Sequence, residues 1–181
     1  MSERERFHVI TGGPGSGKTS LIEALARAGH AHTVEAGRAI IQDQLAIDGP
    51  ALPWRDPLAF AELMLSWEMR SYRMAETTAG PVFFDRGVTD LVGYLTLVGQ
   101  PMLAHIARAA ERFRYDHRVF VAPPWPAIYA QDTERKQTPE EAVRTYEALV
   151  TAYSNCGYEL VSLPLVSVEE RVRFVLDDIG A

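Results

Sequence analysis

Short apolar runs alternate with longer segments of helical periodicity along this chain. The apolar runs predicted to be β-strands are residues 7–11, 32–35, 81–85, 117–121 and 158–163. About seven helices are predicted, over residues 18–28, 36–47, 57–78, 88–98 and 101–112 and in two segments that begin near residues 139 and 168. This alternation is typical of an α/β fold with a mainly parallel sheet. Ligands of such sheets bind at the carboxyl ends of the strands, so we expect the site in the loops after residues 11, 35, 85 and 121.

Helix starts and buried faces also follow from the pattern. Pro57 suits a first helical turn, and Thr138 to Glu141 and Ser167 to Glu170 are capping boxes. Two apolar faces are predicted to be buried. They are Phe60, Met64, Trp67, Ser71 and Met74 in the helix over 57–78, and Val168, Val172, Val175 and Ile179 in the last helix.

Length and composition narrow the class of protein. A chain of 181 residues fits one domain. Its net charge is −6, whereas nucleic-acid-binding proteins usually present a basic face, so no nucleic-acid partner is expected. Cys156 is the single cysteine, which suits a reducing compartment. The start lacks a signal-peptide pattern and no run of about 18 apolar residues occurs, so we expect a cytoplasmic protein without a membrane span.

A glycine-rich segment between the first strand and the first helix carries the clearest chemical signal. Its sequence from Gly12 to Thr19 fits the pattern G-x-x-x-x-G-K-[ST] of a P-loop. Backbone N–H groups of such a loop and the following helix N-terminus bind phosphate groups. We therefore expect ATP with Mg²⁺, bound by Gly12, Gly13, Pro14, Gly15, Ser16, Gly17, Lys18, Thr19 and Ser20. Lys18 is expected to bind the β- and γ-phosphates, and the Thr19 hydroxyl is expected to be a ligand of Mg²⁺.

The predicted strand that ends at Asp85 supplies a second group of candidates. A carboxylate at the end of a buried strand is either a Mg²⁺ ligand, together with Thr19, or a helix N-cap. Arg86 either binds a phosphate or hydroxyl of the substrate or forms a surface ion pair. Asp90 lies one helical turn further, where it can pair with Arg86 and orient it.

The predicted second strand and the segment 125–138 contribute the remaining candidates. Glu35 is either the group that takes a proton from an acceptor hydroxyl or an ordinary polar residue, and Asp85 is the alternative proton acceptor. Residues 125–138 are expected to form a lid in which Arg135 neutralises charge in the transition state, with Lys136 and Arg144 as weaker candidates. Candidate contacts to the acceptor are Trp54, Arg38, Arg55, Arg70 and Arg86, whereas Trp67 is expected in the core.

These motifs resemble those of P-loop nucleoside and nucleotide kinases. The segment Gly12–Lys18 resembles the P-loop of nucleoside-monophosphate kinases, and Phe84–Gly87 with Asp90 resembles the Asp-Arg motif of thymidylate and deoxynucleoside kinases. Gly87 departs from that motif. Nearly the whole chain is similar to small bacterial AAA-family ATPase-like proteins related to ribosylnicotinamide kinase, through the segments 34–38, 52–54, 85–87, 123–125 and 132–135. The resemblance implies a three-layer P-loop fold like that of the nucleoside-monophosphate kinases, ATP and Mg²⁺.

Three functions are compatible with these residues. The leading hypothesis is a single kinase-like domain over residues 1–181 that transfers the γ-phosphoryl group of ATP to a nucleoside, nucleotide or similar small acceptor. The alternative is an ATPase or nucleotide switch that regulates a protein partner. A nucleotide sensor without catalysis ranks last, because Glu35, Asp85 and Arg135 are all present. The pattern specifies neither the acceptor nor the oligomeric state.

Overall fold

A parallel β-sheet forms the centre of the protein. The computed structural model describes residues 4–128 and 138–181, and within these ranges five strands pair in the order β2-β3-β1-β4-β5. Their bounds are β1 Phe7–Gly12, β2 Ala31–His32, β3 Val82–Asp85, β4 Arg118–Ala122 and β5 Glu159–Ser162. Every strand pair is parallel. β1 and β3 are buried along their whole length, as expected for strands covered on both faces.

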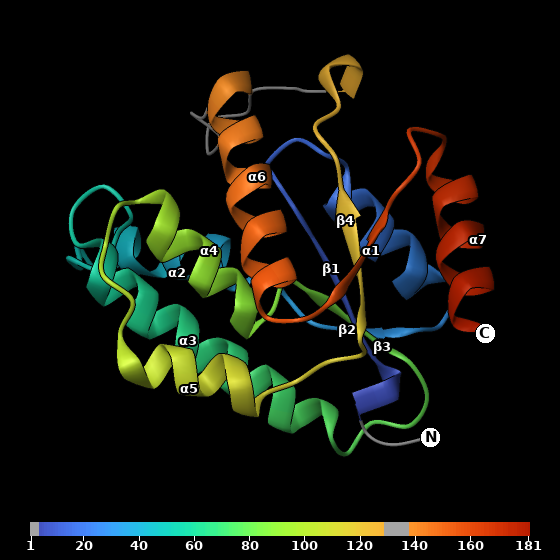
Figure 1. The fold of residues 1–181 in the computed structure, drawn as a ribbon, viewed down its shortest axis with the longest axis horizontal. Coiled ribbons are helices and arrows are strands. Elements are labelled where there is room, and N and C mark those ends of the chain that lie inside the picture. The colour runs from blue at the N-terminus through green and yellow to red at the C-terminus, as the bar shows by residue number, and fades with distance from the viewer. Residues whose placement is uncertain (1–3, 129–137) are drawn as a thin grey trace.

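Helices cover both faces of the sheet (Figure 1). One face carries α1 (Lys18–Arg27) and α7 (Val168–Ile179), and the other carries α3 (Pro57–Ala75), α4 (Val88–Leu97), α5 (Ala104–Arg112) and α6 (Pro139–Asn155). α2 (Ala36–Ala46) packs against α3, and short 3₁₀ turns lie at Arg4–Arg6 and Pro126–Ile128. The larger apolar core lies between the sheet and α3–α6, and the smaller one lies beneath α1 and α7. This arrangement confirms the predicted α/β class and five-stranded sheet.

The second strand is shorter than predicted. It covers Ala31–His32 rather than residues 32–35, because this edge strand pairs with β3 at only two positions. The Thr33 hydroxyl then accepts a hydrogen bond from the backbone N–H of Asp85, at 3.1 Å. The chain turns at this point, so that Glu35 is the N-cap residue of α2 instead of the end of a strand.

The buried face of α3 differs from the predicted one. Met74 is 61% exposed, and the fully buried residues are Phe60, Ala61, Leu65, Glu68, Tyr72 and Ala75. The stripe that contains Ala61, Leu65 and Tyr72 packs against the main core. Phe60, Met64 and Trp67 belong to the neighbouring stripe and pack with α2 residues. The prediction relied on the large apolar side chains and therefore identified the contact with α2 rather than the contact with the core.

The caps and most of the inward face of the last helix are as predicted. Both capping boxes are present, at Thr138 with Glu141 and at Ser167 with Glu170. In α7, Val175 is buried, and Val172 and Ile179 pack against the smaller core while remaining partly exposed. The buried Arg171 on this helix was not predicted. No described helix is long and apolar enough to cross a membrane.

The close contact between α4 and α6 depends on Gly93. A Cβ atom at this position would lie 2.9 Å from Cδ2 of Leu149 and 3.2 Å from the carbonyl oxygen of Ala148. We expect Gly93→Val to lower the free energy of unfolding by about 1–3 kcal/mol, because the added methyl groups overpack this contact. Thr151→Val, at an exposed site on α6, is the control and should change stability by less than about 0.5 kcal/mol. Equal midpoints of denaturant unfolding for the two variants would contradict the prediction.

Candidate functional site

The P-loop passes through a narrow space between β4 and α6. Gly12 has φ 135°, and a Cβ atom there would lie 2.4 Å from the carbonyl oxygen of Ala122. At Gly13 a Cβ atom would lie 2.5 Å from the carbonyl oxygen of Ala142. Glycine is therefore required at both positions, which hold the loop against the sheet and α6. Residues 14–20 then continue along the wall of a large cavity.

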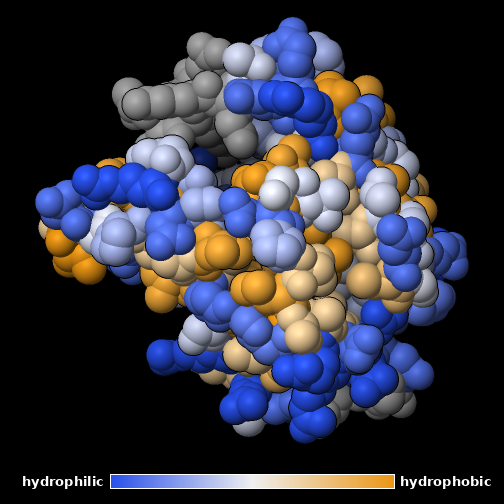
Figure 2. Space-filling view, turned by 60° about the vertical axis from the view of Figure 1, so that its left-hand side comes forward, coloured by the Kyte–Doolittle hydropathy of each residue, from blue (hydrophilic) through white to orange (hydrophobic). Residues whose placement is uncertain are grey.

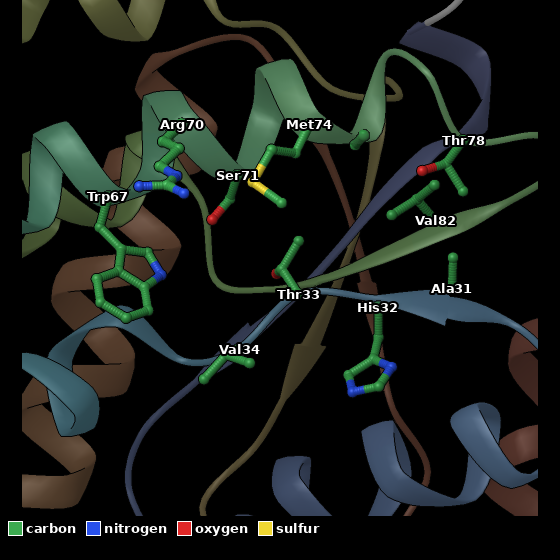
Figure 3. A pocket seen from close by; sticks show the side chains of 11 residues that line it. Ala31, His32, Thr33, Val34, Trp67, Arg70, Ser71, Met74, Thr78 and Val82 are labelled. Atoms are coloured by element: carbon green, nitrogen blue, oxygen red, sulfur yellow. The ribbon is translucent and has the colours of Figure 1, made fainter.

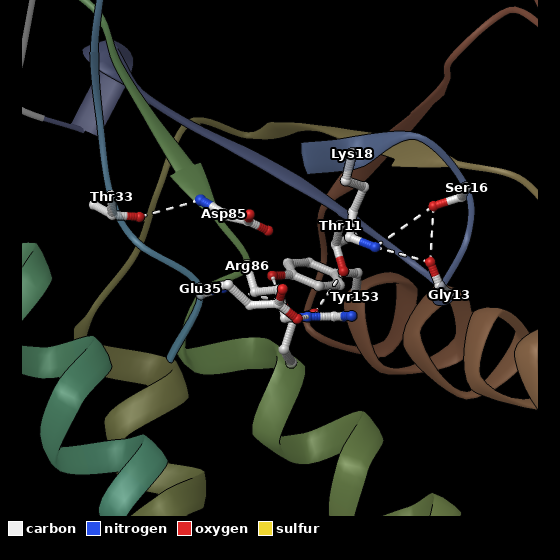
Figure 4. Close-up of polar contacts among 11 residues, drawn as sticks. Thr11, Gly13, Ser16, Lys18, Thr33, Glu35, Asp85, Arg86 and Tyr153 are labelled. Atoms are coloured by element: carbon white, nitrogen blue, oxygen red, sulfur yellow. Dashed lines mark hydrogen bonds and ion pairs between the residues drawn. The ribbon is translucent and has the colours of Figure 1, made fainter. Parts of the chain in front are cut away.

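The side chain of Lys18 is buried and contacts the P-loop from which it extends. Its Nζ donates a hydrogen bond to the carbonyl oxygen of Gly13 at 2.8 Å and lies 3.5 Å from Oγ of Ser16 (Figure 4). Burial lowers the pKa of Lys18 to about 8, and the positive charge of Arg86 acts in the same direction. A buried ammonium group is costly unless an anion lies beside it. The loop thus holds a cation whose charge an incoming phosphate group would balance.

Arg171, which the sequence analysis missed, joins α7 to the P-loop. It is 1% exposed; Nη1 donates to the carbonyl oxygen of Ser16 at 2.8 Å and Nε donates to that of Pro164 at 2.7 Å. The guanidinium carbon lies 4.5 Å from the ring centroid of Trp125. Nη2 is buried and has no hydrogen-bonding partner among the described residues. Its sequence signal was a charge within the apolar stripe between Val168 and Val175.

Asp85 lies at the carboxyl end of β3, beside β1. Its side chain is 5% exposed, and Oδ1 is buried without a hydrogen-bonding partner in the described part of the chain. Burial and the nearby Glu35 carboxylate raise the pKa of Asp85 to about 6. A carboxylate with an unsatisfied oxygen in such a place favours a cation as its partner.

Arg86 connects two carboxylates. Its Nε lies 3.3 Å from Oε1 of Glu35 and its Nη1 lies 3.2 Å from Oδ1 of Asp90, which confirms the predicted pairing with Asp90. Its backbone has φ 72°, in the left-handed region that only glycine adopts easily, as often found at functional sites. Burial by itself would raise the pKa of Glu35, but Arg86 and Lys18 hold it below its usual value. Glu35 is therefore ionised and held in place.

Asp90 receives hydrogen bonds from four sides. Its carboxylate accepts from the hydroxyl groups of Thr11 and Tyr153, each at 2.5 Å, and from the backbone N–H of Gly87 at 2.9 Å. Arg86 is the fourth donor. This network, part of which is drawn in Figure 4, links β1, the turn after β3, α4 and α6.

One cavity of about 1180 Å³ runs from the P-loop to the space between α2, α3 and α4. The sequence-predicted residues in its wall are Pro14, Gly15, Ser16, Gly17, Lys18, Thr19, Ser20, Glu35, Arg38, Trp54, Arg86 and Asp90. Gly12, Gly13 and Asp85 lie behind this wall. On the side of the molecule that carries α2–α5, apolar side chains reach the surface among polar ones (Figure 2). Leu45 and Trp54 are exposed members of the cavity wall.

Three predicted candidates lie elsewhere, and two fall outside the described residues. Arg55 forms an exposed ion pair with Asp48 at 3.4 Å, and Arg144 lies 4.0 Å from Glu141 on the surface of α6. Neither lines the cavity, because each is on the outer side of its segment. Arg70 borders a different hollow, described below. Arg135 and Lys136 lie outside the described residues.

The second hollow, of about 510 Å³, lies between the sheet edge and the outer side of α3 (Figure 3). Trp67, Arg70, Ser71 and Met74 of α3 line one side of it, and Ala31, His32, Thr33 and Val34 line the other. It is separate from the P-loop cavity and contains none of the carboxylates described above.

Solved structures of other proteins, two of them kinases by name, share this fold. The NadR protein in complex with NR aligns with a TM-score of 0.73 and 17% identity over 98% of this chain, which spans about half (52%) of that protein's length. Deoxyadenosine kinase from M. mycoides gives a TM-score of 0.67 at 12% identity, covering 96% of this chain and 98% of that one. Thymidylate kinase from Ehrlichia chaffeensis gives a TM-score of 0.64 at 14% identity, and the alignment covers 98% of this chain and 99% of that one. At these identities the likeness shows a P-loop kinase-like fold.

Sequence comparison points to a family rather than to a particular relative. No curated protein matches this sequence. A family model described as an AAA domain matches residues 7–171, which is most of the chain. The chain therefore belongs to this AAA-domain family, and its P-loop fold is that of the nucleoside and nucleotide kinases.

Proposed function

We propose that this protein is a Mg²⁺-dependent kinase that transfers the γ-phosphoryl group of ATP to a hydroxyl group of a nucleoside, nucleotide or similar small molecule. The observation that carries the proposal is one continuous cavity, which joins the P-loop to Glu35 and Arg86. Phosphoryl transfer needs donor and acceptor side by side in one water-poor space. A cavity of about 1180 Å³ has room for both.

The donor end of the cavity suits a nucleoside triphosphate. N–H groups at the start of α1 and the ammonium group of Lys18 provide positive charge for the phosphates. The Trp125 side chain and Arg171 lie beyond the loop in the same wall, where they are available to a nucleotide base. Arg171 also binds the carbonyl oxygen of Ser16, so it fixes the position of the loop that holds the phosphates.

Thr19 and Asp85 are the residues that we propose to hold Mg²⁺. Both supply the hard oxygen donors that this ion prefers, and the orphaned Oδ1 of Asp85 supports the assignment. No group of three His, Cys, Asp or Glu side chains in residues 4–128 and 138–181 could enclose a metal ion alone. The remaining ligands would then be phosphate oxygens and water, as is usual for Mg²⁺ in kinases. Bound there, the ion would neutralise charge on the phosphates.

Glu35 is the better candidate to accept the proton of the acceptor hydroxyl. It lines the cavity, whereas Asp85 lies behind the wall and is assigned to the metal. Arg86 keeps Glu35 ionised and fixes its position, so the carboxylate can accept a hydrogen bond from a hydroxyl group. The remaining work is the positioning of the two substrates and the neutralisation of charge.

Replacement of Lys18 tests the proposed chemistry. We expect Lys18→Ala to lower kcat/KM by at least about 100-fold, because it removes the buried cation at the phosphates. The measurement is phosphoryl transfer from γ-labelled ATP, with Mg²⁺, to a panel of nucleosides and nucleoside monophosphates. Arg27→Ala, at an exposed site on the same helix, is the matched control and should retain full activity.

Full transfer by Lys18→Ala would overturn the scheme. ATP binding by the wild type without labelled product from any acceptor would favour the alternative, an ATPase or switch that acts on a protein partner.

Replacement of Arg171 tests the donor end separately. We expect Arg171→Met to raise KM for ATP by about 10-fold or more, because the carbonyl oxygen of Ser16 loses a charge-assisted hydrogen bond. KM for the acceptor should change by less than about threefold. Arg173→Met, at an exposed position of α7, should leave both constants unchanged. An equal rise of both KM values would show that Arg171 does not act specifically on the donor.

A further inference from the structure

Glu68 is a buried carboxyl group that the proposed chemistry does not use. It lies in the middle of α3, is 3% exposed and belongs to the wall of the large cavity. The hydrogen bonds and ion pairs among residues 4–128 and 138–181 do not include this carboxyl group. Burial of an unpartnered carboxyl group is costly, so this residue favours a partner from outside the described residues.

The charges around Glu68 decide which form of the carboxyl group is present. Burial raises its pKa well above the usual range, and the carboxylates of Asp90 and Asp85 act in the same direction. Arg86 acts in the opposite direction, but it already pairs with Glu35 and Asp90. The raised pKa favours the neutral acid, which presents a hydroxyl donor and a carbonyl acceptor side by side.

The neighbours of Glu68 form walls suited to a flat ring. Phe60 and Met64 precede Glu68 by eight and four residues on α3, so the three side chains share one face of the helix and line the same cavity. Tyr94 of α4 lies against Phe60, with ring centroids 5.6 Å apart. Its hydroxyl group is buried and has no hydrogen-bonding partner in the described part of the chain. Apolar walls with a few converging polar groups are typical of a small-molecule site.

We propose that Glu68 is the residue that recognises the ring of the acceptor, and that this ring carries a hydrogen-bond donor next to an acceptor. An amino group beside a ring nitrogen, as in adenine and cytosine, or a carboxamide group has this pattern. The ring would lie against Phe60, Met64 and Tyr94. Its donor would form a hydrogen bond with the carbonyl oxygen of Glu68, and its acceptor would receive one from the hydroxyl group of Glu68. This inference rests on the proposed function and specifies the class of acceptor.

Three pairs of acceptors provide the test. The two members of each pair differ in whether the ring carries the hydrogen-bond donor next to the acceptor. They are adenosine with purine riboside, cytidine with the riboside of pyrimidin-2-one, and ribosylnicotinamide with the riboside of nicotinic acid. We measure kcat and KM for each with Mg²⁺ and ATP, together with calorimetric binding of each acceptor alone. When the wild type uses one of these pairs, we expect it to favour the first member by about 10- to 100-fold in kcat/KM. The second member lacks the hydrogen-bond donor, so the carbonyl oxygen of Glu68 is left without a partner.

Two substitutions at Glu68 separate recognition from a structural role. Glu68→Gln keeps one donor and one acceptor on a side chain of the same shape and should retain the preference within about threefold. Glu68→Met has a similar size but no polar pair, so it should abolish the preference through KM and leave kcat nearly unchanged. Glu62→Met is the matched control, since Glu62 is exposed on the same helix and pairs with His105. It should behave as the wild type does.

The outcomes distinguish this inference from the proposed function. Transfer by the wild type without a preference within any pair overturns the inference alone, and so does a preference that persists in a folded Glu68→Met variant. Thermal unfolding shows whether Glu68→Met folds. If it does not fold, a loss of the preference in Glu68→Gln overturns the inference. The absence of transfer to every acceptor overturns the proposed function, and the inference falls with it.

Discussion

The buried carboxylate of Asp90 is the interaction on which the geometry of the site depends. It accepts hydrogen bonds from Thr11, Gly87 and Tyr153 and pairs with Arg86. These donors belong to β1, to the turn after β3 and to α6, so one side chain joins three segments that are distant in sequence. A buried charge is stable only when its hydrogen bonds are satisfied. The position of Arg86, and through it that of Glu35, follows from this network.

The P-loop is held in shape from both sides before any phosphate binds. Gly12 and Gly13 allow close contact with β4 and α6, and Arg171 binds the carbonyl oxygen of Ser16 from α7. The ammonium group of Lys18 donates a hydrogen bond to the carbonyl oxygen of Gly13. A loop fixed in this way needs little reorganisation when the triphosphate arrives, and such preorganisation is the main source of electrostatic catalysis.

Several carboxyl groups lie close to Lys18 and Arg86 at the centre of the site. Lys18 and Arg86 face four of them, which are Glu35, Glu68, Asp85 and Asp90. Arg86 neutralises two by direct pairing. The other two have raised pKa values. Oδ1 of Asp85 is also buried without a hydrogen-bonding partner among the described residues. These two groups are not neutralised by direct pairing, and we therefore assign a metal ion to Asp85 and a hydrogen-bonding ligand to Glu68.

The sequence alone determined the α/β class, five strands, the P-loop and both capping boxes, because each depends on residues close together in the chain. It also indicated the pair of Arg86 and Asp90, which are one helical turn apart. Only the tertiary structure decided that Glu68 and Arg171 are buried. A charged residue on an amphipathic helix is normally solvated, and its burial depends on the helices and loops that pack against it. The length of β2 was decided in the same way, since an edge strand extends only as far as its neighbour pairs with it.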